Sequence, residues 1–376
     1  MSPHRNRAVS IIAYVAFLLL FVELALQAFY FATAGDFLFA RVGVPVFAQN
    51  EHSGIFNRAN LAFPHFTNEF QATYYTNSQG LRTSESRRDY TALPAEGTYR
   101  VMLLGPSFAY GWGVDYEQSF ASLLEEFLEE GKLSTAVEVI NAGVPSLPAA
   151  PQLNWFRNVG RNFAPNLVIQ FVYGSMAVNN RANPGAVVTE DGYLVPKDQS
   201  RGRELRSTLK KFATVFYSWV IYTQLSGSGD AEGSSREVLG AGREMSSLVD
   251  FDTDDPKIAE ALELYKSLDE AVREAGSDLL IVYFPLSYAI HHEDISRWQH
   301  LGVNDVPSQL AFDAAFVKHL NDLGIPCLNA TQDLQEAAVE GDRLYYWLDI
   351  HWTPKWNETV ARAVAKHLLG AHRASR

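Results

Sequence analysis

The stretch that decides the fold is "YRVMLLGPSFAYGWGV", Tyr99 to Val114. Its apolar run ends at Gly105, and Pro106 and Ser107 follow before a group of aromatic residues and glycines. A short, nearly continuous apolar run is typical of a strand that is buried on both faces of a sheet. The sequence therefore predicts a buried strand with Ser107 directly after its carboxyl end.

Four further apolar runs repeat this pattern along the chain. Amphipathic stretches with helical spacing lie between the runs, and this alternation predicts a parallel α/β sheet. The predicted strands are "YRVMLLG", "VEVINAG", "NLVIQFVYG", "DLLIVYFP" and "IPCLN". The predicted helices are "EQSFASLLEEFLEE", "DPKIAEALELYKSLDEAVREAG", "QLAFDAAFVKHLNDLG" and "TPKWNETVARAVAKHLLG".

The longest apolar segment lies at the amino terminus. From Ala8 to Ala34 the only charged residue is Glu23, and the segment exceeds the roughly 20 residues that cross a bilayer core. Because Arg5 and Arg7 precede it, we expect a single-pass anchor in the inner membrane, a cytoplasmic amino terminus and a periplasmic main domain. A cleaved signal peptide is the alternative, since "ATA" at residues 32–34 is a small-residue motif, but secretory apolar regions span only about 7–15 residues.

A carboxylate inside a membrane-spanning segment is costly. Glu23 therefore predicts a polar neighbour or a helix partner within the membrane. A protonated carboxyl, or one that reaches the outer interface, is the other interpretation.

The remaining chain divides into a neck and one large domain. We assign residues 1–36 to the cytoplasmic stub and anchor, 37–98 to an aromatic-rich, irregular juxtamembrane neck, and 99–372 to the α/β domain. An insertion over about 181–255 interrupts the alternation, and it contains an aromatic helix over 203–225 and a Gly/Ser-rich loop over 226–242. We expect the insertion to lie over the carboxyl edge of the sheet, where ligands of open α/β folds bind.

Composition excludes several classes of protein. The 376 residues are 47% hydrophobic, which is ample for a full core. A net charge of -12 without a basic stripe disfavours a nucleic-acid partner. Cys327 is the only cysteine, which excludes a disulfide within the chain and a cysteine-based zinc site.

Three predicted loops carry chemistry. Ser107 follows the first strand, Gly143 follows the second, and Asp349 and His351 precede the last helix. Since the carboxyl ends of parallel strands adjoin, these residues can converge, and a serine nucleophile needs a base that a carboxylate orients. From the residues alone, an N-cap role for Ser107 and a surface or capping pair of Asp349 and His351 stay open.

Five blocks of the sequence occur in the order "TYYTNSQGLRTSE", "YRVMLLGPSFAYGWGV", "VEVINAGVPS", "LVIQFVYG" and "DIHWTPKWNETVA". In these blocks, the sequence resembles the membrane-anchored bacterial SGNH (GDSL-type) hydrolase-like proteins, relatives of extracytoplasmic polysaccharide O-acetyltransferases and acetylesterases. The resemblance spans roughly Thr73 to Gly370. It implies a three-layer α/β/α sandwich with a parallel five-stranded sheet, preceded by one transmembrane helix, and it implies no metal or other cofactor.

The resemblance also assigns roles to residues. Ser107 would be the nucleophile, His351 the general base and Asp349 the carboxylate that orients it. The oxyanion would be held by the backbone N–H groups of Ser107 and Gly143, with Ser175 in place of the asparagine that the family uses.

Two positions depart from the family pattern. Pro106 replaces the Asp of Gly-Asp-Ser, which braces the nucleophile loop, and the Ser175 hydroxyl is shorter than an asparagine side chain. Asn179 or Asn180 is an alternative donor.

For three other features we weigh a structural role against a functional one. We interpret His291 to Asp294 as a solvated helix start rather than a metal cluster. We interpret Asp250 to Asp255 as a solvated loop that ends in an N-cap. A set of tryptophans near the site in sequence predicts a sugar-stacking floor, with core packing as the more common use: Trp112, Trp347, Trp352 and Trp356.

The sequence thus supports two hypotheses. The first is an SGNH-type acyl-ester hydrolase or O-acyltransferase that acts on a cell-envelope carbohydrate. The second is a catalytically degenerate accessory subunit of a membrane complex, with membrane-protein partners bound through the anchor helix. Pro106, Ser175, Glu23 and the aromatic helix favour the second hypothesis.

Overall fold

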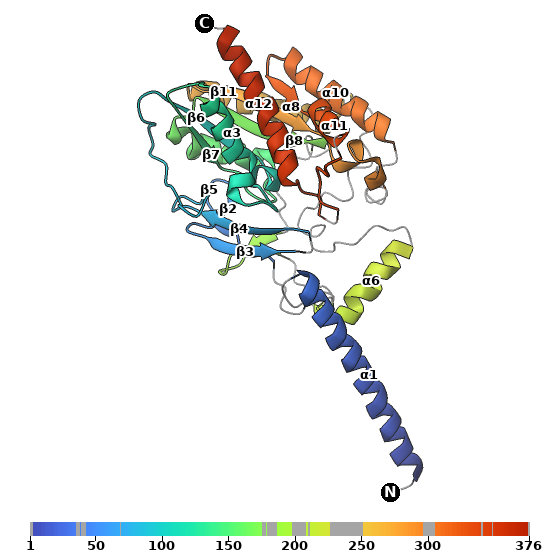
Figure 1. The fold of residues 1–376 in the computed structure, drawn as a ribbon. Coiled ribbons are helices and arrows are strands. Elements are labelled where there is room, and N and C mark those ends of the chain that lie inside the picture. Colours follow the sequence, from blue (N-terminus) through green and yellow to red (C-terminus); the bar gives the residue numbers. More distant parts are fainter. Residues whose placement is uncertain are drawn as a thin grey trace.

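The structure is a computed structural model, and Figure 1 shows its α/β domain at one end of a long helix, α1 (Pro3–Ala34). The N terminus lies at the far end of α1 (Figure 1). The structure describes residues 3–34, 38, 43–67, 69–174, 178, 186–197, 208–209, 211–225, 251–295, 305–339, 341–347 and 349–374.

The five predicted strands form the parallel part of the central sheet, in the order β12-β11-β8-β6-β7. Every residue of β8 is buried, which explains why its sequence is apolar nearly throughout. The prediction of five parallel strands is confirmed. Their bounds are β6 (Thr98–Leu104), β7 (Ala136–Asn141), β8 (Leu167–Tyr173), β11 (Asp278–Phe284) and β12 (Cys327–Asn329).

Helices cover both faces of this sheet. Alternate residues of a strand point to opposite faces, so Val101 and Met102 of β6 belong to two different buried clusters. The three-layer α/β/α sandwich is therefore confirmed. The layer on the Val101 side contains α3 (Phe120–Glu130), α11 (Thr331–Val339) and α12 (Pro354–Ala374), and the layer on the Met102 side contains α4 (Ala149–Asn158), α8 (Pro256–Glu274) and α10 (Val306–Asp322).

The neck differs from the irregular segment that we expected. It adds β5 (Arg82–Thr83), β4 (Gln71–Thr76) and β3 (Ala62–Phe66) beside β7, which makes the sheet mixed and eight-stranded. These strands have two to six residues and mostly alternate between exposed and covered positions, so they lack a long apolar run. The central sheet thus begins before residue 99.

Part of the insertion packs against a second pair of strands in the neck. β1 (Phe47–Asn50) and β2 (Gly54–Asn57) form an antiparallel hairpin. The hairpin of β9 (Ala186–Val188) and β10 (Leu194–Pro196) lies against it, where the Phe47 N–H donates to Gly192 O at 3.0 Å.

The aromatic helix of the insertion is observed as α6 (Ala213–Leu225), which contacts α1. Figure 1 shows it beside α1. The position of the insertion over the carboxyl edge of the sheet stays a prediction, and among the described residues this helix packs against α1. The first turn of α6 is bound to α1 because the carboxylate of Glu23 in α1 accepts hydrogen bonds from the amino terminus of α6. Residues 226–242 lie outside the described residues.

The acidic loop ends in the predicted cap. The carboxylate of Asp255 accepts a hydrogen bond of 2.8 Å from the Lys257 N–H, and Pro256 begins α8. This combination satisfies one of the N–H groups that a helix leaves unpaired at its start.

Candidate active site

Ser107 lies at the carboxyl end of the first parallel strand. β6 ends at Leu104, Gly105 and Pro106 follow, and the short helix α2 (Ser107–Tyr110) begins with Ser107. Pro106 holds the N-cap position of α2. The alternative in which Ser107 is the N-cap is therefore wrong.

The hydroxyl of Ser107 contacts the imidazole of His351, 244 residues later in the chain. Ser107 Oγ lies 2.6 Å from His351 Nε2. On the other side of the ring, His351 Nδ1 contacts Asp349 Oδ1, and the His351 backbone N–H donates to the same oxygen at 2.9 Å. We assign the ring proton to Nδ1, toward the carboxylate, so that Nε2 accepts the Ser107 O–H. The three side chains form one hydrogen-bonded chain.

The surroundings keep Asp349 ionised and His351 in place. Burial acts to raise the pKa of Asp349, but the attraction and hydrogen bonds of His351 outweigh it and hold this pKa below its usual value. The imidazole packs between aromatic rings, with centroids 4.8 Å from that of Phe108 and 5.8 Å from that of Trp112. An ionised partner at Nδ1 stabilises the imidazolium that forms when His351 takes up a proton.

A second carboxylate, Glu69, supports the loop that carries Asp349 and His351. Glu69 Oε2 accepts a hydrogen bond of 2.7 Å from the Asp349 backbone N–H, and Glu69 Oε1 accepts one from the Trp347 backbone N–H. Glu69 lies in the turn between β3 and β4. The sequence does not indicate this role of Glu69, because 280 residues separate it from Asp349 and its partners are backbone N–H groups, which every residue type except proline carries.

Gly143 lies against the helix that begins with Ser107. A Cβ at this position would come within 2.4 Å of Tyr110 N and 2.6 Å of Ala109 C, so only glycine permits the approach. However, the Gly143 N–H donates to Asn141 Oδ1 at 3.0 Å. The Gly143 N–H therefore already has an acceptor in this structure, and its oxyanion role stays a prediction.

Two asparagine side chains brace the turn that carries Ser107. Asn141 Nδ2 donates to Ala109 O at 2.8 Å, and Asn57 Nδ2 donates to Gly143 O at 2.8 Å. These bonds join α2, the loop after β7 and the neck. The third predicted oxyanion residue, Ser175, lies outside the described residues, as do Asn179 and Asn180.

The four tryptophans have different environments. Trp352 and Trp356 are buried and stack on each other in the core, so the sugar-stacking prediction is wrong for them. Trp112 is half-buried beside His351. Trp347 is 53% exposed, and the Arg343 guanidinium lies 4.2 Å from the centroid of its ring. Of the four, only Trp112 and Trp347 present a face near the surface.

The segment around His291 also supports the loop of the site, and it is less solvated than we expected. Asp294 is buried, and its Oδ1 accepts a hydrogen bond of 2.6 Å from Arg343 Nη2. His291 Nε2 accepts one of 3.2 Å from the Leu344 N–H, and burial together with Arg343 lowers the pKa of His291. Within the described part of the chain, no group of three or more His, Cys, Asp or Glu residues is arranged to hold a metal ion.

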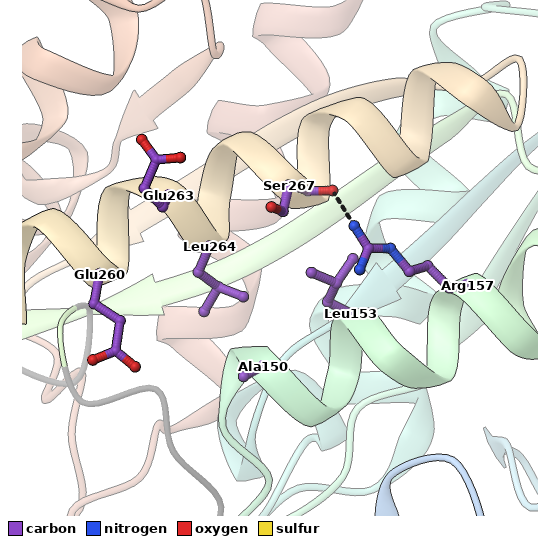
Figure 2. Close-up of a pocket in the computed structure, with 7 residues that line it drawn as sticks. All are labelled: Ala150, Leu153, Arg157, Glu260, Glu263, Leu264 and Ser267. Atoms are coloured by element: carbon purple, nitrogen blue, oxygen red, sulfur yellow. Dashed lines mark hydrogen bonds between the residues drawn. The ribbon is translucent and has the colours of Figure 1, made fainter.

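A separate surface pocket of about 260 Å³ lies between α4 and α8. Figure 2 shows Arg157 reaching across it to donate a hydrogen bond of 3.3 Å to Ser267 O. Its lining contains none of Ser107, Asp349 and His351. The pocket is a groove between two helices of one layer and is separate from the candidate active site.

Residues 245–375 match the family model of the SGNH hydrolase-like domain of the acetyltransferase AlgX. The matched region contains Asp349 and His351, and Ser107 lies before it. No curated protein gives a significant match to the chain.

Several solved structures match most of this chain and nearly all of their own. An acetyl xylan esterase, AlAXEase, has 12% identity over 71% of this chain and 98% of its own, with a TM-score of 0.41. The psychrotrophic esterase EstA from Pseudoalteromonas sp. has 11% identity over 72% and 97%, with a TM-score of 0.37. TesA has 11% identity over 72% and 99%, with a TM-score of 0.38.

Proposed function

We propose that this chain, which carries an SGNH hydrolase-like domain, is a membrane-anchored serine acyl-ester hydrolase or O-acyltransferase. One observation supports the proposal above all others: His351 lies between the Ser107 hydroxyl, 2.6 Å from Nε2, and the carboxylate of Asp349. A serine hydroxyl becomes a nucleophile when a base accepts its proton, and the base needs a partner for the charge that it gains.

The reaction begins with attack of Ser107 Oγ on the carbonyl carbon of an acyl ester. His351 takes the hydroxyl proton and gives it to the departing alcohol oxygen as the old ester bond breaks, which leaves an acyl-serine. Water or a sugar hydroxyl then attacks this acyl-serine. His351 takes the proton of the attacking group and gives it to Ser107 Oγ as the acyl-serine bond breaks, which restores the serine hydroxyl. The Ser107 N–H, the first of α2, has no acceptor within that helix and donates to the carbonyl oxygen as it gains charge.

We further propose an acetyl group as the acyl group and a cell-envelope carbohydrate as its carrier. The matched family model is that of an acetyltransferase, which supports the first part. The exposed indole of Trp347, two residues before Asp349, supports the second part, because an aromatic face offers an apolar surface to a sugar ring.

The proposed location is the inner membrane, with α1 as an uncleaved anchor and the domain on the periplasmic side. Residues Ser10–Ala32 are long and apolar enough to cross a membrane, and Arg5 and Arg7 precede them. Contacts of α1 with α6 support retention of the helix, since cleavage of a signal sequence would remove the partner of the Ala213 and Thr214 N–H groups.

A noncatalytic accessory subunit is the second candidate function. The bond from the Gly143 N–H to Asn141 Oδ1 favours it, because the oxyanion site then lacks one donor. Loss of one such donor lowers kcat by about 10²–10³. This feature alone would therefore reduce the activity of an enzyme without abolishing it.

Labelling of the full chain in detergent with a fluorophosphonate probe tests the proposal. We expect the native protein to be labelled and to release p-nitrophenol from p-nitrophenyl acetate. Ser107→Ala should lose both activities, and Ser86→Ala, which changes an exposed serine, should keep them. Absence of labelling in the native protein, or labelling that persists in Ser107→Ala, would overturn the enzymatic proposal. An unlabelled native protein that purifies with stoichiometric membrane proteins would support the second candidate.

A further inference from the structure

The helix α6 is largely apolar, and its few polar residues do not form a separate polar face. Its sequence, "ATVFYSWVIYTQL", contains no charged residue. A helix of this composition is normally covered on all sides, either by protein or by lipid. In α6, however, the side chains of Val215 and Ile221 are 39% and 55% exposed. The described protein therefore covers only part of it.

The amino terminus of α6 is bound to the carboxylate of Glu23 in α1. Glu23 Oε1 accepts a hydrogen bond of 2.7 Å from the Ala213 N–H, and Glu23 Oε2 accepts one of 2.9 Å from the Thr214 N–H. The Thr214 hydroxyl donates to the same Oε2 at 2.8 Å. The polar helix partner that the sequence predicts for Glu23 is thus the first turn of α6.

Gln27, one turn further along α1, completes this polar contact. Its Nε2 donates to Glu23 Oε1 at 2.8 Å and to Lys211 O at 2.9 Å. At a helix start in water, a local capping side chain or water satisfies the unpaired N–H groups. A start inside hydrocarbon needs protein partners for these groups, and α1 supplies them.

The position of Glu23 sets the depth of this contact. Glu23 lies nine residues before the end of the apolar span at Ala32, which is about 13 Å at 1.5 Å per residue. The thirteen residues of α6 extend about 20 Å, which is too short to cross a hydrocarbon core of about 30 Å. A helix that starts at this depth and rises toward the domain therefore ends near the membrane surface.

Aromatic contacts show that α6 rises in the same direction as α1. Three residues after the Glu23 contact, the Phe216 ring lies 5.8 Å from that of Tyr30, and the next ring, Tyr217, lies 6.0 Å from that of Phe29. Both partners on α1 lie closer to the domain than Glu23 does. Figure 1 shows the two helices diverging from this contact toward the domain.

We propose that α6 is a re-entrant membrane element, with its amino terminus inside the bilayer on Glu23 and its exposed face against lipid hydrocarbon. This inference rests on the proposed anchoring of α1 in a membrane. It extends that proposal, because the chain then enters the bilayer a second time, through the insertion in its α/β domain.

Nitroxide labels in proteoliposomes of the full chain test this inference. On a Cys327→Ala background, we place single cysteines at Val215 and Ile221, with Leu19→Cys on α1 and Leu93→Cys on the domain surface as controls. Oxygen concentrates in lipid and a nickel chelate stays in water. We expect an oxygen-to-nickel collision ratio at Val215 about tenfold above that at Leu93 and close to that at Leu19. The ratio at Ile221 should be smaller than at Val215.

The outcomes separate this inference from the proposal on which it rests. A lipid value at Leu19 with a water value at Val215 overturns the inference alone, whereas a water value at Leu19 overturns the anchor. Low collision rates with both reagents at Val215 also overturn the inference, because they indicate that a protein covers this face.

Two substitutions at Glu23 test the role of its carboxylate. Glu23→Leu keeps α1 apolar but removes both acceptors, so Leu19 should keep its lipid value while Val215 changes to a water value. Glu23→Gln retains one oxygen acceptor and should give an intermediate value at Val215. A lipid value at Val215 that is unchanged in Glu23→Leu would contradict the proposed role of Glu23 in holding α6 in the bilayer.

Discussion

Glu69 Oε2 accepts a hydrogen bond of 2.7 Å from the backbone N–H of Asp349, 280 residues away in the chain. The same carboxylate accepts the N–H of Trp347, so one side chain holds two points of the loop that carries the proposed base. The turn between β4 and the edge strand β3 thereby supports the loop from which Asp349 and His351 project.

Glu69→Gln should lower kcat about tenfold and leave KM nearly unchanged. Its side chain keeps one oxygen acceptor, but the new amide group faces a second N–H group and cannot accept from it. A small displacement of a catalytic group can cost up to about 100-fold in rate. Steady-state kinetics with p-nitrophenyl acetate measures this split, and Glu117→Gln, an exposed matched change, should have no effect. A rise in KM at constant kcat would contradict a positioning role.

Gly143→Ala should reduce activity about 100-fold and destabilise the fold by about 1–3 kcal/mol. The added Cβ would lie 2.4 Å from Tyr110 N, so α2 and Ser107 must shift. Gly370→Ala is the control, because a Cβ there meets no atom within 4 Å. Fluorophosphonate labelling rates and thermal unfolding measure the two effects. A Gly143→Ala protein with native labelling would show that α2 adapts without moving Ser107.

Trp347→Ala should leave turnover of p-nitrophenyl acetate within about twofold of native and reduce activity on an acetylated polysaccharide about tenfold. The small ester needs no contact beyond the serine, whereas a sugar chain would lose the exposed aromatic face. The backbone N–H that binds Glu69 is unchanged by this substitution. Trp347→Phe should recover most of the activity. Equal losses on both substrates in Trp347→Ala would argue against a sugar contact.

Asp313 should make the protein less stable as the pH rises from about 4 to about 7. Burial raises the pKa of Asp313 to about 6, while hydrogen bonds from Tyr283 and Gln309 act against this shift. The folded state thus binds the proton more tightly than the unfolded state, whose carboxyl titrates near 4. The stability from this group is complete below about pH 4 and is lost as the pH passes 6, by up to about 3 kcal/mol.

Thermal unfolding of Asp313→Asn across this pH range measures that contribution. The amide cannot ionise, so the stability of the variant should fall less than that of the native protein between about pH 4 and 7. Asp342→Asn, at an exposed position, should retain the native slope. Identical slopes in the native protein and Asp313→Asn would mean that this buried carboxyl does not titrate differently on unfolding.

Local patterns were sufficient to predict the central part of the fold. The strand pattern of β6 and β8 is readable because strands buried on both faces are apolar throughout, independent of what covers them. The strands of the neck were missed because they are short and only partly apolar, and because three of the five residues of the edge strand β3 are exposed. The position of α6 against α1 was not predicted, because an uncharged and largely apolar helix can pack against many apolar surfaces.

For the candidate site, residue types and loop positions predicted which three side chains meet. The carboxyl ends of parallel strands share one edge of a sheet, and this rule applies before any coordinates are known. The three residues that meet lie at this edge, after a strand or before a helix: Ser107, Asp349 and His351. Their catalytic roles stay a prediction. The supporting groups were not predicted, because Glu69 and Asn141 act mainly on backbone atoms, whose positions depend on the whole fold.

By itself, the sequence determined the class of the fold, the order of its parallel strands along the chain and the residues at their carboxyl ends, because apolar periodicity is a local property. Only the tertiary structure decided which carboxylate supports the Asp349 loop, what accepts the Gly143 N–H and what Glu23 binds. Each of these contacts ends on a backbone N–H, and Glu23 and Ala213 lie 190 residues apart. A backbone N–H is the same in almost every residue, so its partner depends on where the folded chain places it.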